Sequence, residues 1–427
     1  MLQDLRDLLD NSFSPYHATT QMKKRLLDAD FIELQLENSW QNSLKANNAY
    51  FIVLQGSSII SFYIPQKIDF DKMVIIGAHT DSPALKLKTQ KPYIKESSLM
   101  LGVEVYGGAL LHTWFDRDLK IAGRVSFENK EGIQSSLVNL PLLCRVPNLA
   151  IHLNRDIQTK GFIIDKQTQL PVLVGDKTNS LEVLTSQISE QLKIKDDDIL
   201  AIDLFLYDNQ RSELGGGNNN VDFLHSGKLD NLAMCHAGIT SLINAKQRKA
   251  RNFVMTAFFD HEEVGSQSSS GGDSVFLNEL MRRVYENLNL SNEKLQQVKS
   301  KSLFLSADMA HATHPNYSDK HDHNHKVYLN QGPVIKINAN QRYATNSQSA
   351  AQIELIARKQ KITLQKYINH TSLSCGSTIG PLISSQLAIE TIDLGNPMLS
   401  MHSIREMCGA KDHEKMINLM TATLLDF

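Results

Sequence analysis

The sequence predicts an α/β protein whose main domain is interrupted by a β-rich insertion. Apolar runs typical of buried strands, such as Met73–Gly77 and Phe253–Phe259, occur together with helical patterns in both outer parts of the chain. Between these parts, residues 86–226 carry short apolar runs that favour strands. We therefore expect residues 1–85 and 227–427 to form one discontinuous domain. Residues 86–226 would form a second, β-rich domain that builds a dimer interface and a lid.

The spacing of apolar residues predicts the individual elements. Leucines at positions 2, 5, 8 and 9 fit one face of an N-terminal helix that packs on the core. Residues Ala49–Ile64 have the pattern of a hairpin. In the insertion, the apolar runs Leu110–Phe115, Gly123–Phe127 and Ile202–Tyr207 predict strands. Further along the chain, Leu277–Lys301 has helical periodicity.

Two adjacent glutamates, Glu262 and Glu263, follow the apolar run Phe253–Phe259 and precede Gly265 and a Ser/Gly-rich loop. Adjacent residues at a strand end point in different directions. One glutamate can therefore bind a metal ion while its neighbour acts as a base, as metal-assisted hydrolysis requires. Taken alone, the stretch would fit a solvated acidic turn equally well.

Four further segments place metal-binding residue types where a strand or helix meets a loop. Three of them follow predicted strands and one lies near the start of a predicted helix. Ligands of open α/β sheets bind outside the carboxyl ends of the strands, so such segments can converge on one pocket. The residues concerned are His79 with Asp81, Asp308 with His311, His402, and Asp230 at the helix start.

The ligand types fit a centre with two divalent metal ions. The set contains two imidazoles and three carboxylates, from His79, Asp230, Glu263, Asp308 and His402. Zinc accepts this mixture of nitrogen and oxygen, and affinity alone does not separate it from cobalt or manganese. Paired catalytic ions lie about 3.5–4 Å apart, and we expect Asp230 to bridge them. Asp81 suits a carboxylate that fixes the tautomer of His79. A lone strand-end histidine would instead fit a structural role.

Composition excludes several classes of protein. The chain has 427 residues, 41% of them hydrophobic, with a formal charge of −2 and a pI near 6.7. This balance gives no general attraction to nucleic acid or to an anionic membrane. No run approaches the ~20 apolar residues of a membrane span, and the acidic N-terminus is unlike a signal peptide. Four scattered cysteines predict a reduced, cytoplasmic protein, with Cys375 more suited to packing than to nucleophilic catalysis.

An ordered set of motifs spans nearly the whole chain. The motifs lie at residues 77–83 (Gly-Ala-His-Thr-Asp-Ser-Pro), 150–155, 228–232, 260–266 (Asp-His-Glu-Glu-Val-Gly-Ser), 306–317, 332–345, 375–381 and 401–407 (Met-His-Ser-Ile-Arg-Glu-Met). Together they resemble the aspartyl aminopeptidase family of dinuclear zinc exopeptidases. The resemblance implies a three-layer α/β/α catalytic domain of the zinc-exopeptidase type, interrupted by a β-rich domain for dimerisation.

The resemblance also implies roles for the site residues. His79, Asp230 and Asp308 would hold one ion, and Asp230, Glu263 and His402 would hold the other. Glu262 would be the general base that takes a proton from the attacking water and passes it to the leaving amine. The substrate would be a peptide with a free N-terminus.

Specificity and assembly are further implications of the resemblance. Lys336 would contact the acidic side chain of an N-terminal Asp or Glu, and His311 would line the same pocket. His152 would reach across a dimer interface to stabilise the tetrahedral intermediate in the partner's site. The family implies a homododecamer built from dimers. Related members can favour neutral residues, so acidic preference is a separate expectation from peptidase activity.

Two other functions fit parts of the sequence. The same metal centre could belong to an amidohydrolase that acts on N-acylated amino acids, although Lys336 and the length of the match argue against it. A structural or cargo-like assembly protein would not need the intact base and ligand set. We therefore expect a metal-dependent aminopeptidase.

Overall fold

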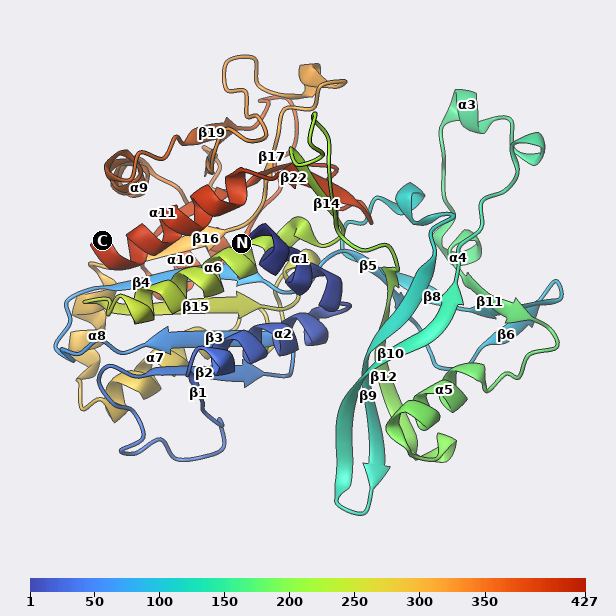
Figure 1. The fold of residues 1–427 in the computed structure, drawn as a ribbon, viewed down its shortest axis with the longest axis horizontal. Helices are drawn as coiled ribbons and strands as arrows, with labels where there is room; N and C mark the ends of the chain where they lie inside the picture. Colours follow the sequence, from blue (N-terminus) through green and yellow to red (C-terminus); the bar gives the residue numbers. More distant parts are fainter.

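The computed structural model describes residues 1–427 and shows two parts, a larger and a smaller one (Figure 1). A nine-stranded sheet lies at the centre of the larger part. The smaller part is the β-rich insertion. No helix in the structure combines the length and apolarity needed to cross a membrane. The sheets and helices of the structure confirm the predicted α/β class.

The central sheet combines parallel and antiparallel pairs. Its strands, in spatial order, are β1 (Ile32–Glu33), β2 (Ala49–Leu54), β3 (Ser58–Tyr63), β15 (Phe253–Phe259), β4 (Met73–His79), β16 (Leu303–Ala307), β20 (Glu390–Gly395), β18 (Val334–Ile337) and β19 (Gln365–Ile368). The strands β15, β4, β16 and β20 are neighbours and run parallel, so their carboxyl ends meet at one edge. The predicted hairpin is the antiparallel pair β2–β3.

The parallel strands are apolar on both faces because helices cover both. Every residue of β4 and β15 is buried, as expected for strands inside a parallel sheet. Alternate residues serve different cores: Val74 and Ile76 face one, and Met73 and Ile75 face the other. Gly77 has no side chain, and a Cβ there would lie 2.2 Å from Cζ of Phe304. The glycine therefore lets this ring pack against the centre of the sheet.

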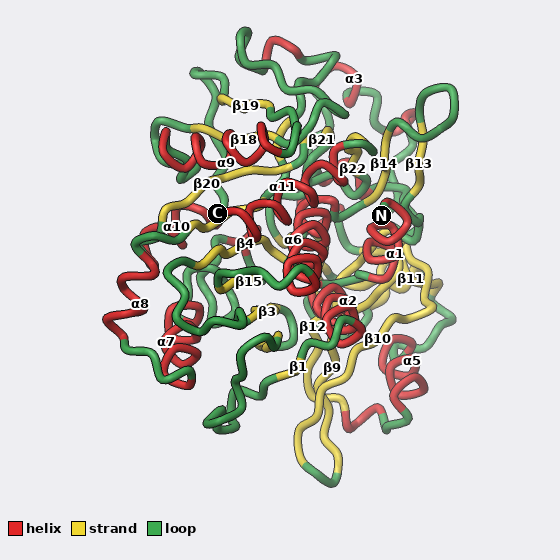
Figure 2. The backbone as a smooth tube through the Cα atoms, turned by 60° about the vertical axis from the view of Figure 1, so that its left-hand side comes forward, coloured by secondary structure: helices red, strands yellow, loops and turns green.

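The helices form the two outer layers. One layer contains α1 (Leu2–Asn11), α2 (Pro15–Asp28), α6 (Leu229–Gln247), α9 (Ser347–Lys359) and α11 (Asp412–Asp426). The other contains α7 (Phe276–Asn287), α8 (Asn292–Lys299) and α10 (Ile379–Leu387). Figure 2 shows α6 beside α11, in front of the sheet. The predicted N-terminal helix is α1, which buries Leu5, Leu8 and Leu9.

The insertion has its own core between small sheets and short helices. A five-stranded sheet has the order β10 (Gly132–Cys144), β9 (Leu119–Asn129), β12 (Ile199–Asp208), β5 (Ala84–Leu87) and β8 (Val103–Tyr106). A three-stranded sheet contains β11 (Val172–Asp176), β7 (Ser98–Leu101) and β6 (Tyr93–Lys95). The helices are α3 (Ile157–Lys160), α4 (Lys166–Gln169) and α5 (Val183–Leu192). The predicted strands at 123–127 and 202–207 lie within β9 and β12.

A third small sheet joins both parts of the chain. It contains β13 (Glu213–Gly215), β14 (Phe223–Ser226), β22 (Glu406–Gly409), β21 (Pro397–Leu399) and β17 (Ala310–His311). Strand pairing departs from the predicted division at both boundaries. β5 starts before residue 86 but pairs with β8 in the insertion's sheet. β14 ends at residue 226 but pairs with β22 of the larger part. That division stays a prediction.

The strand prediction for Leu110–Phe115 was wrong. Residues Leu111–Trp114 form the 3₁₀ helix η1. The other 3₁₀ helices are η2 (Ile151–Leu153), η3 (Asp196–Asp198), η4 (Glu262–Val264) and η5 (Ser318–Lys320). A short apolar run without alternation does not distinguish a strand from a helical turn, and here the run is the connection that leaves β8.

Candidate metal centre

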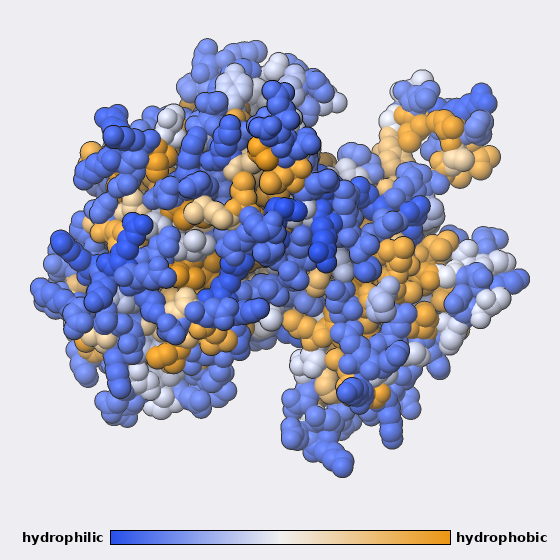
Figure 3. All heavy atoms as spheres, viewed as in Figure 1, coloured by the Kyte–Doolittle hydropathy of each residue, from blue (hydrophilic) through white to orange (hydrophobic).

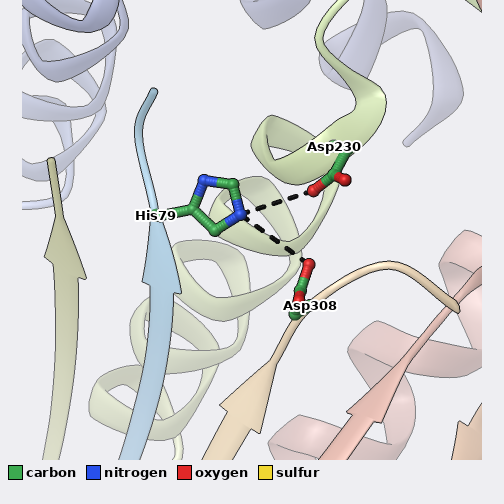
Figure 4. Close-up of side chains that lie close together, drawn as sticks. All are labelled: His79, Asp230 and Asp308. Carbon is green, nitrogen blue, oxygen red and sulfur yellow. Dashed lines mark ion pairs between the residues drawn. The ribbon is translucent and has the colours of Figure 1, made fainter. Parts of the chain in front are cut away.

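The carboxyl edge of the parallel strands gathers the first group of predicted ligands. His79 ends β4, Asp308 follows β16, and Asp230 lies at the start of α6, where the backbone is not yet helical. Nε2 of His79 lies 3.4 Å from Oδ1 of Asp230 and 3.7 Å from Oδ1 of Asp308. Figure 4 shows the imidazole pointing between the two carboxylates. One cation placed among these atoms would contact all three side chains.

A second group adjoins the first through Asp230. Nε2 of His402, in the loop after β21, lies 3.4 Å from Oδ2 of Asp230 and 3.4 Å from Oε1 of Glu263. In each group the potential ligand atoms lie within 4.8 Å of one another. The two oxygens of Asp230 therefore face different histidines, which is the arrangement expected of a bridging carboxylate.

The buried oxygens of these groups fit divalent metal ions. Oδ1 of Asp230 and Oε1 of Glu263 are buried and accept no hydrogen bond. Unpartnered buried carboxylate oxygens are costly, because each has lost its water without gaining a donor. A cation would compensate both. Nitrogen and oxygen donors without thiolate suit a catalytic zinc ion or a similar divalent metal.

The charges of the site perturb both histidines. Burial alone would lower the pKa of His79, but Asp230, Asp308 and Asp81 together raise it well above its ordinary value. The pKa of His402 rises to about 10, because Asp230 and Glu263 outweigh the opposing effect of burial. The surplus of carboxylates over imidazoles thus makes the site attractive to cations.

Glu262 and Glu263 lie on η4, the 3₁₀ turn after the end of β15, and occupy different environments. The side chain of Glu263 is 5% exposed and faces His402, whereas that of Glu262 is 16% exposed, with Oε2 at 4.0 Å from Nε2 of His79. Burial, assisted by the neighbouring carboxylates, raises the pKa of Glu262 to about 7. A carboxylate with this pKa is suited to proton transfer near neutral pH.

Asp81 lies behind His79 and contacts both glutamates. Nδ1 of His79 is 3.0 Å from the carbonyl oxygen of Asp81 and 3.4 Å from its carboxylate. The same carboxylate accepts the amide hydrogens of Glu262 and Glu263 at 3.2 and 3.1 Å. Asp81 is therefore placed to orient the imidazole and the turn that carries the two glutamates.

Lys336 lies inside the site and not on the surface. Its Nζ is 3.2 Å from Oδ2 of Asp308 and donates to the carbonyl of Met309 at 3.0 Å. The ring of Tyr343 lies 5.2 Å from this ammonium group. His311, on β17, has an exposed position, and its ring contacts that of Tyr367 at 5.7 Å between centroids.

His152 is the one predicted site residue that lies apart from the others within this chain. It belongs to η2, is exposed, and precedes α3, which Figure 1 places at the outer end of the insertion. Its predicted role in a partner's site stays a prediction.

Sequence reasoning missed two side chains that support the ligands. Glu406, on β22, is buried and accepts the amide hydrogens of Asp230 at 3.1 Å and His402 at 2.8 Å. Burial and the charge of Asp230 raise its pKa to about 8. Tyr106, at the end of β8, donates its hydroxyl to Asp81 at 2.7 Å. Glu406 lies within the motif at residues 401–407, which was a signal for it, whereas the sequence carried no signal for Tyr106.

Comparisons with known proteins identify the family and the fold. Residues 8–423 match the model of the aminopeptidase I zinc metalloprotease family, M18. Aspartyl aminopeptidase 4 of Saccharomyces cerevisiae is 39% identical, over 96% of this chain and 91% of the yeast protein. A cryo-EM structure of an Ape4 and Nbr1 complex has a TM-score of 0.93 at 36% identity, covering 100% of this chain and 85% of that one. The S. cerevisiae mApe1 dodecamer has a TM-score of 0.84 at 26% identity, covering 98% and 95%.

The family match and the similar proteins thus identify a metalloaminopeptidase, a hydrolase. The chain belongs to the M18 family of zinc metalloproteases. This membership favours an aminopeptidase over the amidohydrolase and the assembly protein considered from the sequence.

Proposed function

We propose that this enzyme binds two divalent ions, zinc in preference to cobalt or manganese, and removes N-terminal Asp or Glu from peptides. The observation that carries the proposal is the pair of ligand groups joined through Asp230, with His79 and Asp308 on one side and Glu263 and His402 on the other. The acidic preference is supported by the name of the similar yeast aspartyl aminopeptidase.

The side chains divide the reaction between them. When bound, the ions would polarise the scissile carbonyl and make an attacking water more acidic. Glu262, the more exposed of the two glutamates, would take the proton of that water and deliver it to the leaving amine. Asp81 would keep His79 and the glutamate turn in place, through the hydrogen bonds described above.

Lys336 would provide the acidic preference. An ammonium group has three donors, and two of them serve Asp308 and Met309. The third would bind the side-chain carboxylate of the substrate. His311 would line the same pocket, since Tyr367 contacts both its ring and that of Tyr343 beside the lysine.

The insertion would join two chains into a dimer, and dimers would assemble into a dodecamer. Apolar residues with high exposure lie within 11 positions of His152 along the chain: Leu149 at 59%, Leu153 at 74% and Ile163 at 80%. Figure 3 shows hydrophobic atoms gathered over the α3 end of the insertion. Covering these residues would bring His152 to a partner chain, where its imidazole would stabilise the tetrahedral intermediate. We also propose a cytoplasmic location, which four unpaired cysteines support.

The test is the initial rate on a panel of aminoacyl-anilides after each divalent metal is returned to chelated enzyme. We expect Asp and Glu substrates to exceed Leu, and Glu262→Gln to abolish cleavage of all of them. In Lys336→Met, kcat/KM for the Asp substrate should fall about 10–100-fold relative to Leu, the range for a lost hydrogen bond to a charged group. The Leu rate controls for disturbance of Asp308.

Other results would change specific parts of the proposal. A preference for Leu would keep the metal chemistry and remove Lys336 from its role. Cleavage of N-acylated amino acids without cleavage of any free-amine substrate would overturn the aminopeptidase function.

A further inference from the structure

The insertion sends one short segment into the metal-ligand loops of the larger part. This segment, residues 106–113, leaves the end of β8 and continues into η1. Its residues make hydrogen bonds with Asp81 and with the loop that carries His402. These contacts cross between the two parts of the molecule.

Tyr106 holds the outer side of Asp81. Its hydroxyl donates to Oδ2 of Asp81 at 2.7 Å, and the amide of Glu263 donates to the same oxygen at 3.1 Å. The ring packs edge-on against Phe205, with centroids 5.8 Å apart. The phenol is therefore fixed by the insertion's core while its hydroxyl fixes a carboxylate next to His79.

The same segment orients His402. Nδ1 of His402 donates to the carbonyl of Gly108 at 3.2 Å, and the amide of Leu110 donates to the carbonyl of His402 at 3.0 Å. The amide of Ile404 donates to the hydroxyl of Thr113 at 3.1 Å. A proton held on Nδ1 leaves Nε2, which lies between Asp230 and Glu263, as the ring nitrogen that would ligate a bound metal ion.

Two glycines permit this close approach. A Cβ on Gly108 would lie 3.2 Å from Nδ1 of His402. Gly107 has φ of +70°, and a Cβ there would lie 3.0 Å from Cβ of Glu263. A side chain at either position would require the segment, or the ligand beside it, to shift by a few tenths of an ångström.

We propose that residues 106–113 are a positioning element of the metal centre, with Tyr106 acting through Asp81 and the Gly108 carbonyl acting through His402. Partners of this kind set ligand orientation and tautomer. The inference rests on the proposed metal centre and adds that part of its metal affinity comes from the insertion.

A second tyrosine provides the matched control. Tyr16, on α2, donates to Oδ2 of Asp203, on β12, at 3.2 Å. It also joins the larger part to the insertion by a tyrosine–carboxylate bond, but it contacts no predicted ligand. Tyr106→Phe and Tyr16→Phe therefore remove the same kind of bond, and only the first removes one beside the metal centre.

Zinc affinity tests the proposal and is measured by competition with a chromogenic chelator. The midpoint of thermal unfolding in EDTA is recorded for each variant as well. Tyr106→Phe should raise the Kd for zinc about 10-fold, the lower end of the range for lost outer partners of metal ligands, because Tyr106 acts on His79 through Asp81. Excess zinc should restore its kcat. Tyr16→Phe should leave zinc affinity unchanged, and the midpoints of both variants in EDTA should shift alike.

A parent enzyme that takes up no zinc would overturn the proposed function together with this inference. A parent that binds zinc, with Tyr106→Phe binding it equally well, would overturn the inference alone. An equal loss of zinc affinity in Tyr16→Phe would also overturn the inference, because the effect would then come from weaker contact between the larger part and the insertion.

Gly108→Ala tests the His402 side of the element independently. The added methyl group should weaken zinc binding and leave the bond from Tyr106 to Asp81 in place. Gly102→Ala is the control, since its Cβ would meet only Cδ of Lys88, at 3.7 Å. Unchanged zinc affinity in Gly108→Ala would contradict the role assigned to the Gly108 carbonyl.

Discussion

The larger part and the insertion bury their strands differently. All residues of β4 and β15 are buried, whereas β10 buries only Val138, Leu140 and Cys144. Helices cover both faces of the central sheet, while the insertion exposes Leu149, Leu153 and Ile163 to solvent. The larger part therefore completes its own core, and the insertion keeps apolar surface of the kind that another chain covers.

The two parts also contribute differently to the site. All five predicted ligands come from the larger part, and the insertion supplies hydrogen bonds that hold two of their supports, Asp81 and the His402 loop. The larger part thus supplies the predicted ligands, and the insertion supplies groups that position them. The following predictions test this separation.

The largest effect should come from Asp230→Asn. This change removes the charge shared by the two ligand groups, so zinc affinity should fall by more than the roughly 10–100-fold expected for a lost outer partner, and hydrolysis should fall to background. Asp203→Asn, in the insertion's sheet, is the control and should retain both ions. Metal content by elemental analysis after dialysis provides the measurement, and two ions retained in Asp230→Asn would contradict the bridge.

Core truncation should distinguish the two parts next. Phe258→Ala, at a fully buried site of β15, should cost about 3–5 kcal/mol of unfolding free energy. Ile133→Ala, at a position 73% exposed on β10, should stay within about 0.5 kcal/mol. Urea unfolding followed by circular dichroism measures both. A comparable cost at Ile133 would mean that the exposed hairpin is part of a core after all.

Charges on the exposed apolar residues should separate the chains without unfolding them. The double variant Leu153→Asp and Ile163→Asp should sediment as a smaller species than the parent, because a buried unpaired carboxylate opposes association. Val275→Asp is the control, at a residue 73% exposed on the larger part. An unchanged sedimentation coefficient in the double variant would place the interface elsewhere.

A smaller effect should appear as loss of stability in mild acid. His236 and His413 are buried, with Nδ1 of one 2.8 Å from Nε2 of the other, and burial lowers the pKa of both. The unfolded chain binds a proton on each histidine near pH 6.5 and the folded chain does not. The contribution of the pair to the free energy of unfolding is therefore fully present above that pH. Below it, stability falls by up to about 1.4 kcal/mol per pH unit for each histidine.

Urea unfolding between pH 7.5 and 5 tests this sign. His413→Gln should flatten the dependence, whereas His323→Gln, at an exposed position, should not. The same pH dependence of stability in the parent and in His413→Gln would contradict the buried neutral pair.

Much of the larger part could be predicted because its signals are local. An apolar run such as Met73–Gly77 can be satisfied only inside the sheet, and the residue that follows it must then lie at the sheet's edge. The positions of His79, Asp308 and the two glutamates follow from this rule. The strand prediction for Leu110–Phe115 was wrong because an apolar run without periodicity does not define its conformation. Leu111–Trp114 of this run form η1.

The α/β class, the strands that end at the site, and the residue types that suit divalent ions all follow from the sequence pattern. Which atoms face one another depends on the folded arrangement of the elements. The bond from Tyr106 to Asp81 spans 25 positions, and that from Glu406 to the Asp230 amide spans 176. Local pattern carries no information about such contacts, because they arise from the packing of separate elements, and that packing also places the insertion beside the metal ligands.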